Sequence, residues 1–336
     1  MATNILAGDI HGGHARAGVV YEEDGRLILD ESTFTHIGSK DNTNLGDVLS
    51  ASFDQAKRKS KRIIGGVAVD VASPIDGISI VKKPPNVACL KKAAIESGST
   101  NLNLQEILQG RYAVQAAVYN DLQAEAAGVT AMGLLGNPPP EDYLYENGGT
   151  GYGGARTQKG RTSAAEPGHV TLSSGGIFVP LCGCGREGCA EAYVGSDYVA
   201  DRVRQICRAK LIEITECDPN VFADKQAKKG EQWAVKHLCE VARTWGGLWR
   251  NLLQQYPAYK KILVTGSYLR AVLEIPAFLA EVRNVLKESS FPETFGQIPI
   301  EAAPMPEYDK QPIAPMIGAA HLLLQYQHEQ AKTERG

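Results

Sequence analysis

The amino-acid sequence predicts an α/β protein with two lobes, and three observations support this prediction. The chain has 336 residues, which at roughly 100–200 residues per domain suggests two domains. Apolar, β-branched runs alternate with stretches suited to helices, which is the pattern of an α/β fold. A strand–glycine-turn–strand pattern occurs twice, in LAGDIHGG and YENGGTGYGG, about 140 residues apart. The repeat indicates two lobes built on one plan, with a cleft between them.

The first lobe is expected to span residues 1–121. NILAGDIHGG reads as a strand that ends in glycines, and RAGVVYEEDGRLIL as two strands joined by a hairpin turn at EEDG. RIIGGVAVDVA is a further buried strand, and ISIVKKPPN is a strand stopped by Pro84 and Pro85. The segment YAVQAAVYND ends this lobe at Asn120 and Asp121.

The second lobe is expected to span residues 122–311. It opens with a helix in LQAEAAGVTAMGLL and a loop in GNPPPED. From residue 196 to residue 256, apolar residues recur at a spacing near 3.6, which predicts helices. KKILVTGSYLR then predicts a strand, a glycine turn and a helix, and QIPIEAAPMPEY a late strand and loop. A C-terminal helix over 312–328 is expected to complete the first lobe.

Composition and charge are those of an ordinary soluble globular protein. Hydrophobic residues make up 43% of the chain and charged residues 22%, and the net charge is −3. This balance argues against a general attraction to nucleic acid or to anionic membranes. No apolar run approaches the roughly 18–20 residues that span a bilayer, and MATNILAGDI lacks the features of a signal peptide. The expected location is the cytoplasm.

The densest chemical motif is a cluster of one histidine and three cysteines, with the spacing His169-x12-Cys182-x-Cys184-x4-Cys189. One imidazole and three thiolates form the closed tetrahedral set that structural zinc favours over magnesium or calcium. Four protein ligands leave no open position, so the zinc is expected to brace a loop. The alternative is a metal-free turn. The remaining cysteines are expected to be small core residues: Cys89, Cys207, Cys217 and Cys239.

Asp121 is the candidate catalytic base. It ends a buried segment, where α/β sheets place their ligands. A carboxylate there can accept the proton of a hydroxyl that attacks phosphorus. Asn120 can fix a hydroxyl by donating and accepting hydrogen bonds. The alternative for this Asn-Asp pair is an ordinary helix N-cap.

Three glycine turns are candidate nucleotide-binding elements. Asp9 follows a strand in GDIHGG, and a carboxylate there can hold hydrated magnesium beside phosphates. GGTGYGG exposes backbone N–H groups and the Thr150 hydroxyl, which can cradle phosphate oxygens. VTGSYL is a third such turn. None is a P-loop, because no G-K-[ST] follows, and the alternative is that each is an ordinary turn without a ligand.

Together these motifs resemble the ROK family (repressors, open reading frames, kinases) and the bacterial glucokinases within it. The most specific match is GHVTLSSGGIFVPLCGCGREGCAE, which fits the family's G-H…C-x-C-G-x-x-G-C-x-E signature. GDIHGG, PPN at 84–86, YND and GGTGYGG match further family motifs in the correct order. The resemblance covers nearly the whole chain.

The resemblance implies an actin-like ATPase (ribonuclease H-like) fold of two α/β lobes, with ATP and magnesium in the cleft and a sugar beside them. It makes Asp121 the general base. The zinc would hold its loop so that two carboxylates, which accept several hydrogen bonds from vicinal hydroxyls, face the sugar. The implied sugar-binding residues are Asn86, Asn120, Asp121, Glu166, His169 and Glu191, and the implied phosphate, magnesium and nucleotide residues are Asp9, Gly12, Gly13, Thr150, Gly151 and Gly266.

The chain also departs from the family pattern. The first motif usually reads D-x-G-G-T, whereas here it reads DIHGGH, with His11 and His14 in unusual places. Pro167 follows the implied sugar glutamate, TGSYL lacks a second glycine, and ASPID replaces a Pro-Gly-Pro turn. These departures indicate a divergent member and leave open the effect of His14.

The resulting expectation is an ATP-dependent hexokinase-type kinase that converts glucose to glucose 6-phosphate. N-acetylmannosamine, N-acetylglucosamine, fructose, an aminosugar or a cyclitol are alternative acceptors, and polyphosphate is an alternative donor. By resemblance the protein is expected to be a homodimer. A sugar-responsive repressor or an inactive sugar sensor is the alternative from another class. Because the first strand begins near residue 3, we expect no DNA-binding helix-turn-helix ahead of the core.

Overall fold

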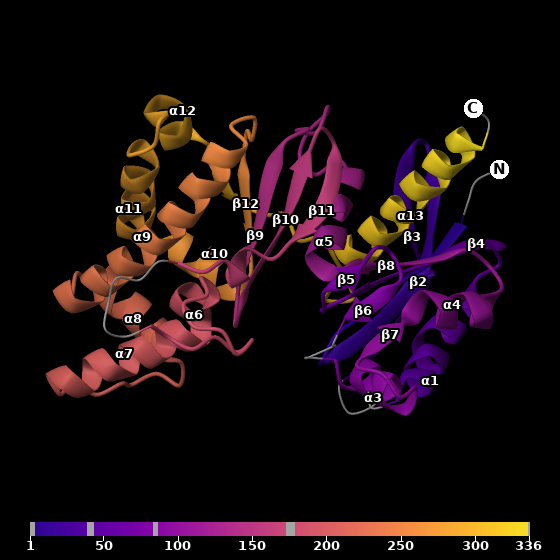
Figure 1. Cartoon of the computed structure of the whole chain (residues 1–336), viewed down its shortest axis with the longest axis horizontal. Helices are drawn as coiled ribbons and strands as arrows, with labels where there is room; N and C mark the ends of the chain where they lie inside the picture. Colours follow the sequence, from indigo (N-terminus) through magenta and orange to yellow (C-terminus); the bar gives the residue numbers. More distant parts are fainter. Residues whose placement is uncertain (1–3, 39–43, 83–86, 173–178, 335–336) are drawn as a thin grey trace. The chain divides into compact units, whose positions relative to one another are not determined.

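The computed structural model describes residues 4–38, 44–82, 87–172 and 179–334. It divides into two compact units, one formed by residues 1–139 together with 304–336 and the other by residues 140–303 (Figure 1). The sequence placed a division after residue 121. In the structure, α5 (Asp121–Ala131) belongs to the first unit because it packs along the C-terminal helix α13 (Ala314–Thr333).

A five-stranded sheet forms the centre of the first unit, with the order β3-β2-β1-β4-β8. The antiparallel strands β1, β2 and β3 are followed across the sheet by β4 and β8, which run parallel to β1. The carboxyl ends of β1, β4 and β8 therefore meet at one edge, the edge at which such sheets bind ligands. The strands are β1 (Asn4–Ile10), β2 (His14–Glu23), β3 (Arg26–Gly38), β4 (Ile64–Val71) and β8 (Ala116–Asn120).

The hairpin between β2 and β3 forms as the sequence predicted. Glu23 pairs with Arg26, and the two residues between them, Asp24 and Gly25, have φ values of 50° and 73°. Two positive φ angles in a two-residue loop are typical of a type I′ turn, whose twist matches that of the strands. The Asp-Gly dipeptide therefore sets the register of the hairpin.

Helices cover both faces of this sheet, because its strands alternate their apolar side chains between two cores. Leu6 of β1 lies in one core, and Ile5 and Ala7 lie in the other. The second core contains α5 and α13. The remaining elements are α1 (Leu45–Val48), a π-helical turn (Leu49–Asp54), α2 (Gln55–Lys59), β5 (Ile75–Asp76), β6 (Ile80–Lys82), α3 (Ala88–Glu96), β7 (Asn101–Asn103), α4 (Leu104–Tyr112), β14 (Glu307–Tyr308) and β15 (Gln311–Pro312).

The second unit repeats the same plan in its own sheet, whose order is β11-β10-β9-β12-β13. Again an antiparallel hairpin lies beside strands that run parallel to its first strand. The two glycine-turn motifs therefore occupy equivalent places, between β1 and β2 and between β9 and β10. The strands are β9 (Tyr143–Gly148), β10 (Tyr152–Gln158), β11 (Arg161–Ala165), β12 (Ile262–Thr265) and β13 (Ile300–Ala302).

The long helix α9 (Gln232–Gln255) supplies the centre of the second core. It buries Trp245 and Trp249 completely, and the Trp245 ring meets Tyr152 of β10 edge to face at 4.5 Å. The other helices are α6 (Glu191–Val194), α7 (Ser196–Lys210), α8 (Pro219–Lys228), α10 (Ser267–Leu273), α11 (Pro276–Lys287) and α12 (Pro292–Gln297), with a 3-10 turn at Pro167–His169.

The four scattered cysteines differ in burial. Cys89 and Cys207 are buried as predicted, Cys239 is half-buried, and Cys217 is exposed, so the expectation of a core position was wrong for Cys217. Among the helices described, none combines the length and the apolar character that a membrane span requires.

The helices α5 and α13 cross in close backbone contact. A Cβ atom added to Gly128 would overlap the carbonyl oxygen of Ala314, and one added to Gly318 would overlap that of Ala124. The two backbones therefore touch, and both glycines are required by packing.

We expect Gly318→Ala to lower the free energy of unfolding by about 1–3 kcal/mol, because the added methyl group has no room. Gly110→Ala in α4 is the matched control. A Cβ there would meet no described atom within 4 Å, so this change should raise stability by about 0.5–1 kcal/mol. Urea unfolding of both variants measures the difference, and equal effects would contradict the packing argument.

Candidate functional site

Three aspartates lie at the carboxyl ends of the parallel strands of the first unit. Asp9 of β1 and Asp70 of β4 are register neighbours, and both are fully buried. Asp121 directly follows β8. Asp9 and Asp121 were predicted as site residues from the sequence, whereas Asp70 was not. The same signal would have found it, because Asp70 ends a buried β-branched run just as Asp9 does.

Asp9 is held in a buried ion pair with Arg16 of β2. The Arg16 Nε donates to Asp9 Oδ1 at 2.9 Å, and its Nη2 donates to Oδ2. Arg16 is only 2% exposed, and its Nη1 also donates to the Pro312 carbonyl at 2.8 Å. Two-point pairing of this kind fixes both partners. A magnesium ion held by Asp9 would have to share the carboxylate with Arg16.

His11 joins this edge from the turn after β1. Its Nε2 lies 3.4 Å from Asp70 Oδ1. Burial lowers the pKa of His11, whereas its hydrogen bond to Asp70 raises it, and the charges of Asp9 and Asp121 raise it further, to about 9. Burial raises the pKa of Asp70 to about 7, against the effect of His11. The titrations of the two groups are therefore linked through this buried contact.

His14 lies beside His11, with the two rings stacked at 5.0 Å. Its Nε2 is 3.8 Å from Asp9 Oδ1. Burial lowers the pKa of His14 to about 4, and the charge of Arg16 adds to this effect, although Asp9 opposes it. His14 is therefore a neutral imidazole at physiological pH, unlike its neighbour.

Asp121 is half-buried, and burial raises its pKa, with the charge of His11 opposing the shift. A raised pKa brings a carboxylate closer to the range in which a general base is efficient. Asn120 acts as the N-cap of α5: its Oδ1 accepts from Leu122 N and Gln123 N at 3.1 and 3.3 Å. Its Nδ2 donates to a backbone carbonyl, so the side chain is held in place.

The glycines of the first turn are accessible. Gly12 and Gly13 are exposed, and the turn is closed by a hydrogen bond from His11 N to His14 O at 2.9 Å. A Cβ at Gly13 would meet no described atom within 4 Å, so the fold itself does not require glycine there. The bare backbone is open to a ligand. Asn86, the further residue implied for the sugar site, lies outside the described residues.

In the second unit, the four residues of the cysteine cluster converge as the spacing predicted. Their ligand atoms all lie within 4.8 Å of one another. Cys184 Sγ is 3.7 Å from Cys189 Sγ, and Cys182 Sγ is 3.8 Å from His169 Nδ1. Tetrahedral zinc with Zn–S bonds of about 2.3 Å has ligand edges of about 3.8 Å. The donor set and its spacing therefore fit zinc.

Arg186, which the sequence analysis did not consider, supports this cluster. Its hydrogen bonds to Cys184 lower the pKa of that thiol to about 6, which favours the thiolate that a metal binds. Its Nη2 also donates to the His169 carbonyl at 3.2 Å. Its role could have been suspected from the sequence, because a basic residue lies inside the Cys-x-Cys-x4-Cys segment.

Glu191 connects the cysteine cluster to the second glycine turn. Its Oε1 lies 3.4 Å from Cys182 Sγ, and its Oε2 accepts from Tyr152 N at 3.1 Å. A Cβ on Gly151 would lie 2.5 Å from Oε2, so glycine is needed for this approach. Thr150, in the same turn, is exposed. Glu166, the other implied sugar carboxylate, is exposed at the start of the 3-10 turn that carries His169.

Gly266 also lies against the turn after β9. It follows β12 with a φ of +84°, and a Cβ there would overlap Asn147 Oδ1 and the Gly148 backbone. The turn after β12 therefore packs directly on the turn after β9, and the two predicted nucleotide elements of this unit are brought together. Both requirements, a positive φ and a close approach, favour glycine.

Glu146 is a buried carboxyl in β9 that the sequence analysis missed. Tyr152 OH donates to its Oε2 at 2.6 Å. Burial raises the pKa of Glu146 to about 8, although the hydrogen bond from Tyr152 and the charge of Arg156 oppose the shift. The group is therefore protonated in the folded protein at neutral pH.

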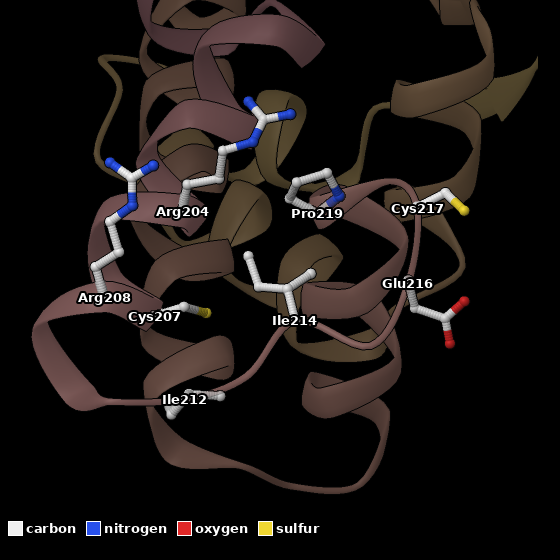
Figure 2. Close-up of a pocket in the computed structure, with 8 residues that line it drawn as sticks. All are labelled: Arg204, Cys207, Arg208, Ile212, Ile214, Glu216, Cys217 and Pro219. Atoms are coloured by element: carbon white, nitrogen blue, oxygen red, sulfur yellow. The ribbon is translucent and has the colours of Figure 1, made fainter.

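A separate hollow lies at the end of α7 and the start of α8 (Figure 2). Arg204 and Arg208 extend from α7, and Ile214 lies between the two helices. Its lining in the described chain includes none of the predicted site residues, so we assign it no part in the site.

Glu146 should make stability depend on pH. Because its folded pKa of about 8 lies above the ordinary value of 4.5, the folded state binds the extra proton. The free energy of unfolding should then fall as pH rises from 4.5 through about 8, by at most about 1.4 kcal/mol per pH unit. Glu146→Gln keeps an acceptor for Tyr152 and should remove this loss.

The measurement is urea unfolding at pH 5 and pH 8. The stability of Glu146→Gln relative to the unmodified protein should be higher at pH 8 than at pH 5. Glu213→Gln, at an exposed position, is the control and should show the same difference at both pH values. A Glu146→Gln difference that does not change with pH would contradict the assigned proton.

Similarity to known proteins identifies the family of this chain. The model of the ROK family matches residues 8–326. A glucokinase from Streptomyces coelicolor is 29% identical over 160 residues, an alignment that covers 43% of this chain and 49% of that enzyme. The chain thus spans about half the length of the curated relatives it matches.

Two solved structures extend the similarity to nearly the whole chain. The ROK hexokinase from Thermus thermophilus is 21% identical, with a TM-score of 0.66, and the match covers 95% of this chain and 98% of that one. A ROK family glucokinase from Streptomyces griseus, in complex with glucose and AMPPNP, is also 21% identical, with a TM-score of 0.64 and coverage of 96% and 99%. The chain therefore belongs to the ROK family and has the actin-like ATPase fold that the sequence predicted.

Proposed function

We propose that this protein is a sugar kinase that transfers a phosphoryl group from ATP to a hexose hydroxyl, with glucose as the first candidate and glucose 6-phosphate as the product. The observation that carries the proposal is the position of Asp121 at the carboxyl end of β8, with a pKa raised by burial. The similarity to the Streptomyces coelicolor glucokinase supports the choice of sugar.

Asp121 accepts the proton of the attacking hydroxyl in this proposal. Such a base contributes only while it is ionised, and its rigid placement after a buried strand limits the positions of the hydroxyl that can react. Asn120 holds the start of α5 and thereby the Asp121 backbone. The proposed sugar contacts are Asn86, Asn120, Glu166, His169 and Glu191.

ATP and magnesium are the proposed cosubstrates. The accessible backbone at Gly12 and Gly13 and the exposed Thr150 hydroxyl support phosphate binding, because unhindered N–H and O–H groups suit phosphate oxygens. Gly151 belongs to the same turn as Thr150, and Gly266 packs on it. Magnesium would supply positive charge beside the phosphates near Asp9.

A structural zinc ion is the proposed resident metal, held by His169, Cys182, Cys184 and Cys189. Ligand edges of 3.7 and 3.8 Å support this assignment. By fixing Cys182, the site would position Glu191, which lies against both Cys182 and the second glycine turn. We further propose a cytoplasmic location, and, from the family resemblance, a homodimer.

Asp121→Asn should reduce phosphoryl transfer by about 10²–10⁴-fold, because the amide cannot accept the proton. Sugar binding should be largely retained, since the side chain keeps its size. A coupled assay with ATP, magnesium and a panel of sugars measures turnover, and calorimetry measures sugar binding. The panel contains glucose, N-acetylmannosamine, N-acetylglucosamine, fructose, an aminosugar and a cyclitol, with polyphosphate as a second donor.

The control is Asp47→Asn, an exposed aspartate of the same unit, which should keep full turnover. Turnover of Asp121→Asn close to that of the unmodified protein would refute its role as base. Sugar binding without turnover by the unmodified protein, with every donor and sugar, would favour a sensor over a kinase.

The zinc assignment has its own test. The purified protein should contain about one zinc ion per chain, and Cys184→Ser should lose most of it, because a closed site needs all four ligands. Cys217→Ser, at another exposed cysteine of the same unit, should keep the metal. Elemental analysis and a thermal melt measure both variants. Equal zinc content in the two variants would contradict the site.

A further inference from the structure

We propose that the first unit binds a divalent first-row transition-metal ion through Asp9, His11 and His14. Each residue offers one ligand atom, and these three atoms lie within 4.8 Å of one another. The site is separate from the cysteine cluster, which belongs to the second unit. The proposal does not rest on the kinase function, because it concerns binding in the absence of nucleotide and sugar.

The three residues are brought together by one hairpin. Asp9 ends β1 opposite Arg16 of β2 in the ladder, and the turn between the strands is closed from His11 N to His14 O at 2.9 Å. This geometry stacks the two imidazole rings at 5.0 Å with their planes 10° apart. The ligands are therefore held by a continuous, hydrogen-bonded segment, as a preorganised site requires.

The charge of the surroundings favours a cation. The carboxylates of Asp9, Asp70 and Asp121 all act on His11. In the described part of the chain, the buried permanent positive charge that pairs with them is Arg16. Buried carboxylates are costly unless their charge is balanced. A divalent ion at His11 and His14 would add positive charge beside these three aspartates.

Asp70 provides an independent observation. It is fully buried, and its Oδ1 faces His11 Nε2, whereas its Oδ2 accepts no hydrogen bond from any described residue. Buried carboxylate oxygens are nearly always satisfied, so an unpartnered one points to a missing ligand. A metal ion beside His11, or a water molecule bound to it, would satisfy this oxygen.

The ligand types select the class of metal. Two imidazole nitrogens and one carboxylate favour manganese, iron, cobalt, nickel or zinc over magnesium and calcium, which prefer oxygen ligands. Ligands at about 2.0–2.1 Å from a metal are separated by about 3.0–3.4 Å. His14 Nε2 and Asp9 Oδ1 are 3.8 Å apart, so a small rotation of the half-buried His14 ring completes the site.

The test uses Co²⁺ and the full chain with its cysteine cluster saturated with zinc. We expect one Co²⁺ per chain to bind without ATP or sugar, and its absorption to lack thiolate charge-transfer bands. His11→Ala and His14→Ala should each weaken binding by on the order of tenfold or more. His328→Ala is the matched control, an exposed histidine of the same unit, and should bind Co²⁺ as the unmodified protein does.

A second measurement needs no variant. In the unmodified protein, bound Co²⁺ should perturb the imidazole NMR signals of His11 and His14 more strongly than that of His328. The proposal fails if the alanine variants bind Co²⁺ as tightly as His328→Ala, if binding requires ATP, or if the Co²⁺ spectrum carries thiolate bands. A failure of this kind leaves the kinase assays unaffected, so the two proposals are distinguished.

Discussion

The buried ion pair of Asp9 and Arg16 is the interaction on which the candidate site of the first unit depends. It joins β1 to β2 at the point where the sheet ends and the candidate ligands begin. Arg16 also donates to the Pro312 carbonyl, so the same guanidinium ties the hairpin to the segment that precedes α13. Breaking a buried pair by removing one partner is strongly destabilising, since the other charge remains buried and uncompensated.

In the second unit, glycine and carboxylate contacts hold the corresponding turn. Glu191 lies between Cys182 and the Tyr152 amide, and Gly151 leaves the space that its side chain fills. Gly266 packs on Gly148. The turn after β9 is thus contacted by both Glu191 and the turn after β12, and it occupies the same topological place as the turn after β1 in the other sheet.

Much of this arrangement could be predicted from local sequence. Asp24-Gly25 specifies a turn by its own backbone preferences, and the cysteine spacing specifies a cluster because its ligands lie on one short segment. The contact between His11 and Asp70 was not predictable in this way, since the residues are 59 positions apart and meet only through the register of β1 and β4.

Other features depend on tertiary contacts and were therefore not predicted from the sequence. The helix α5 belongs to the first unit because of α13, which comes almost at the end of the chain. Arg16 looked like an ordinary strand residue, and its role follows from burial beside Asp9. The exposure of Cys217 depends on the loop before α8, whose path no local pattern indicates.

The discontinuity of the first unit has a consequence for synthesis on the ribosome. Residues 140–303 are inserted between its two parts, so all five strands of its sheet are synthesised well before the last helix, α13. The apolar face formed by Ile5, Ala7 and Ala68 waits for Met316 and Leu323 of that helix. The inserted unit is continuous in sequence and can therefore complete its core before the first unit does.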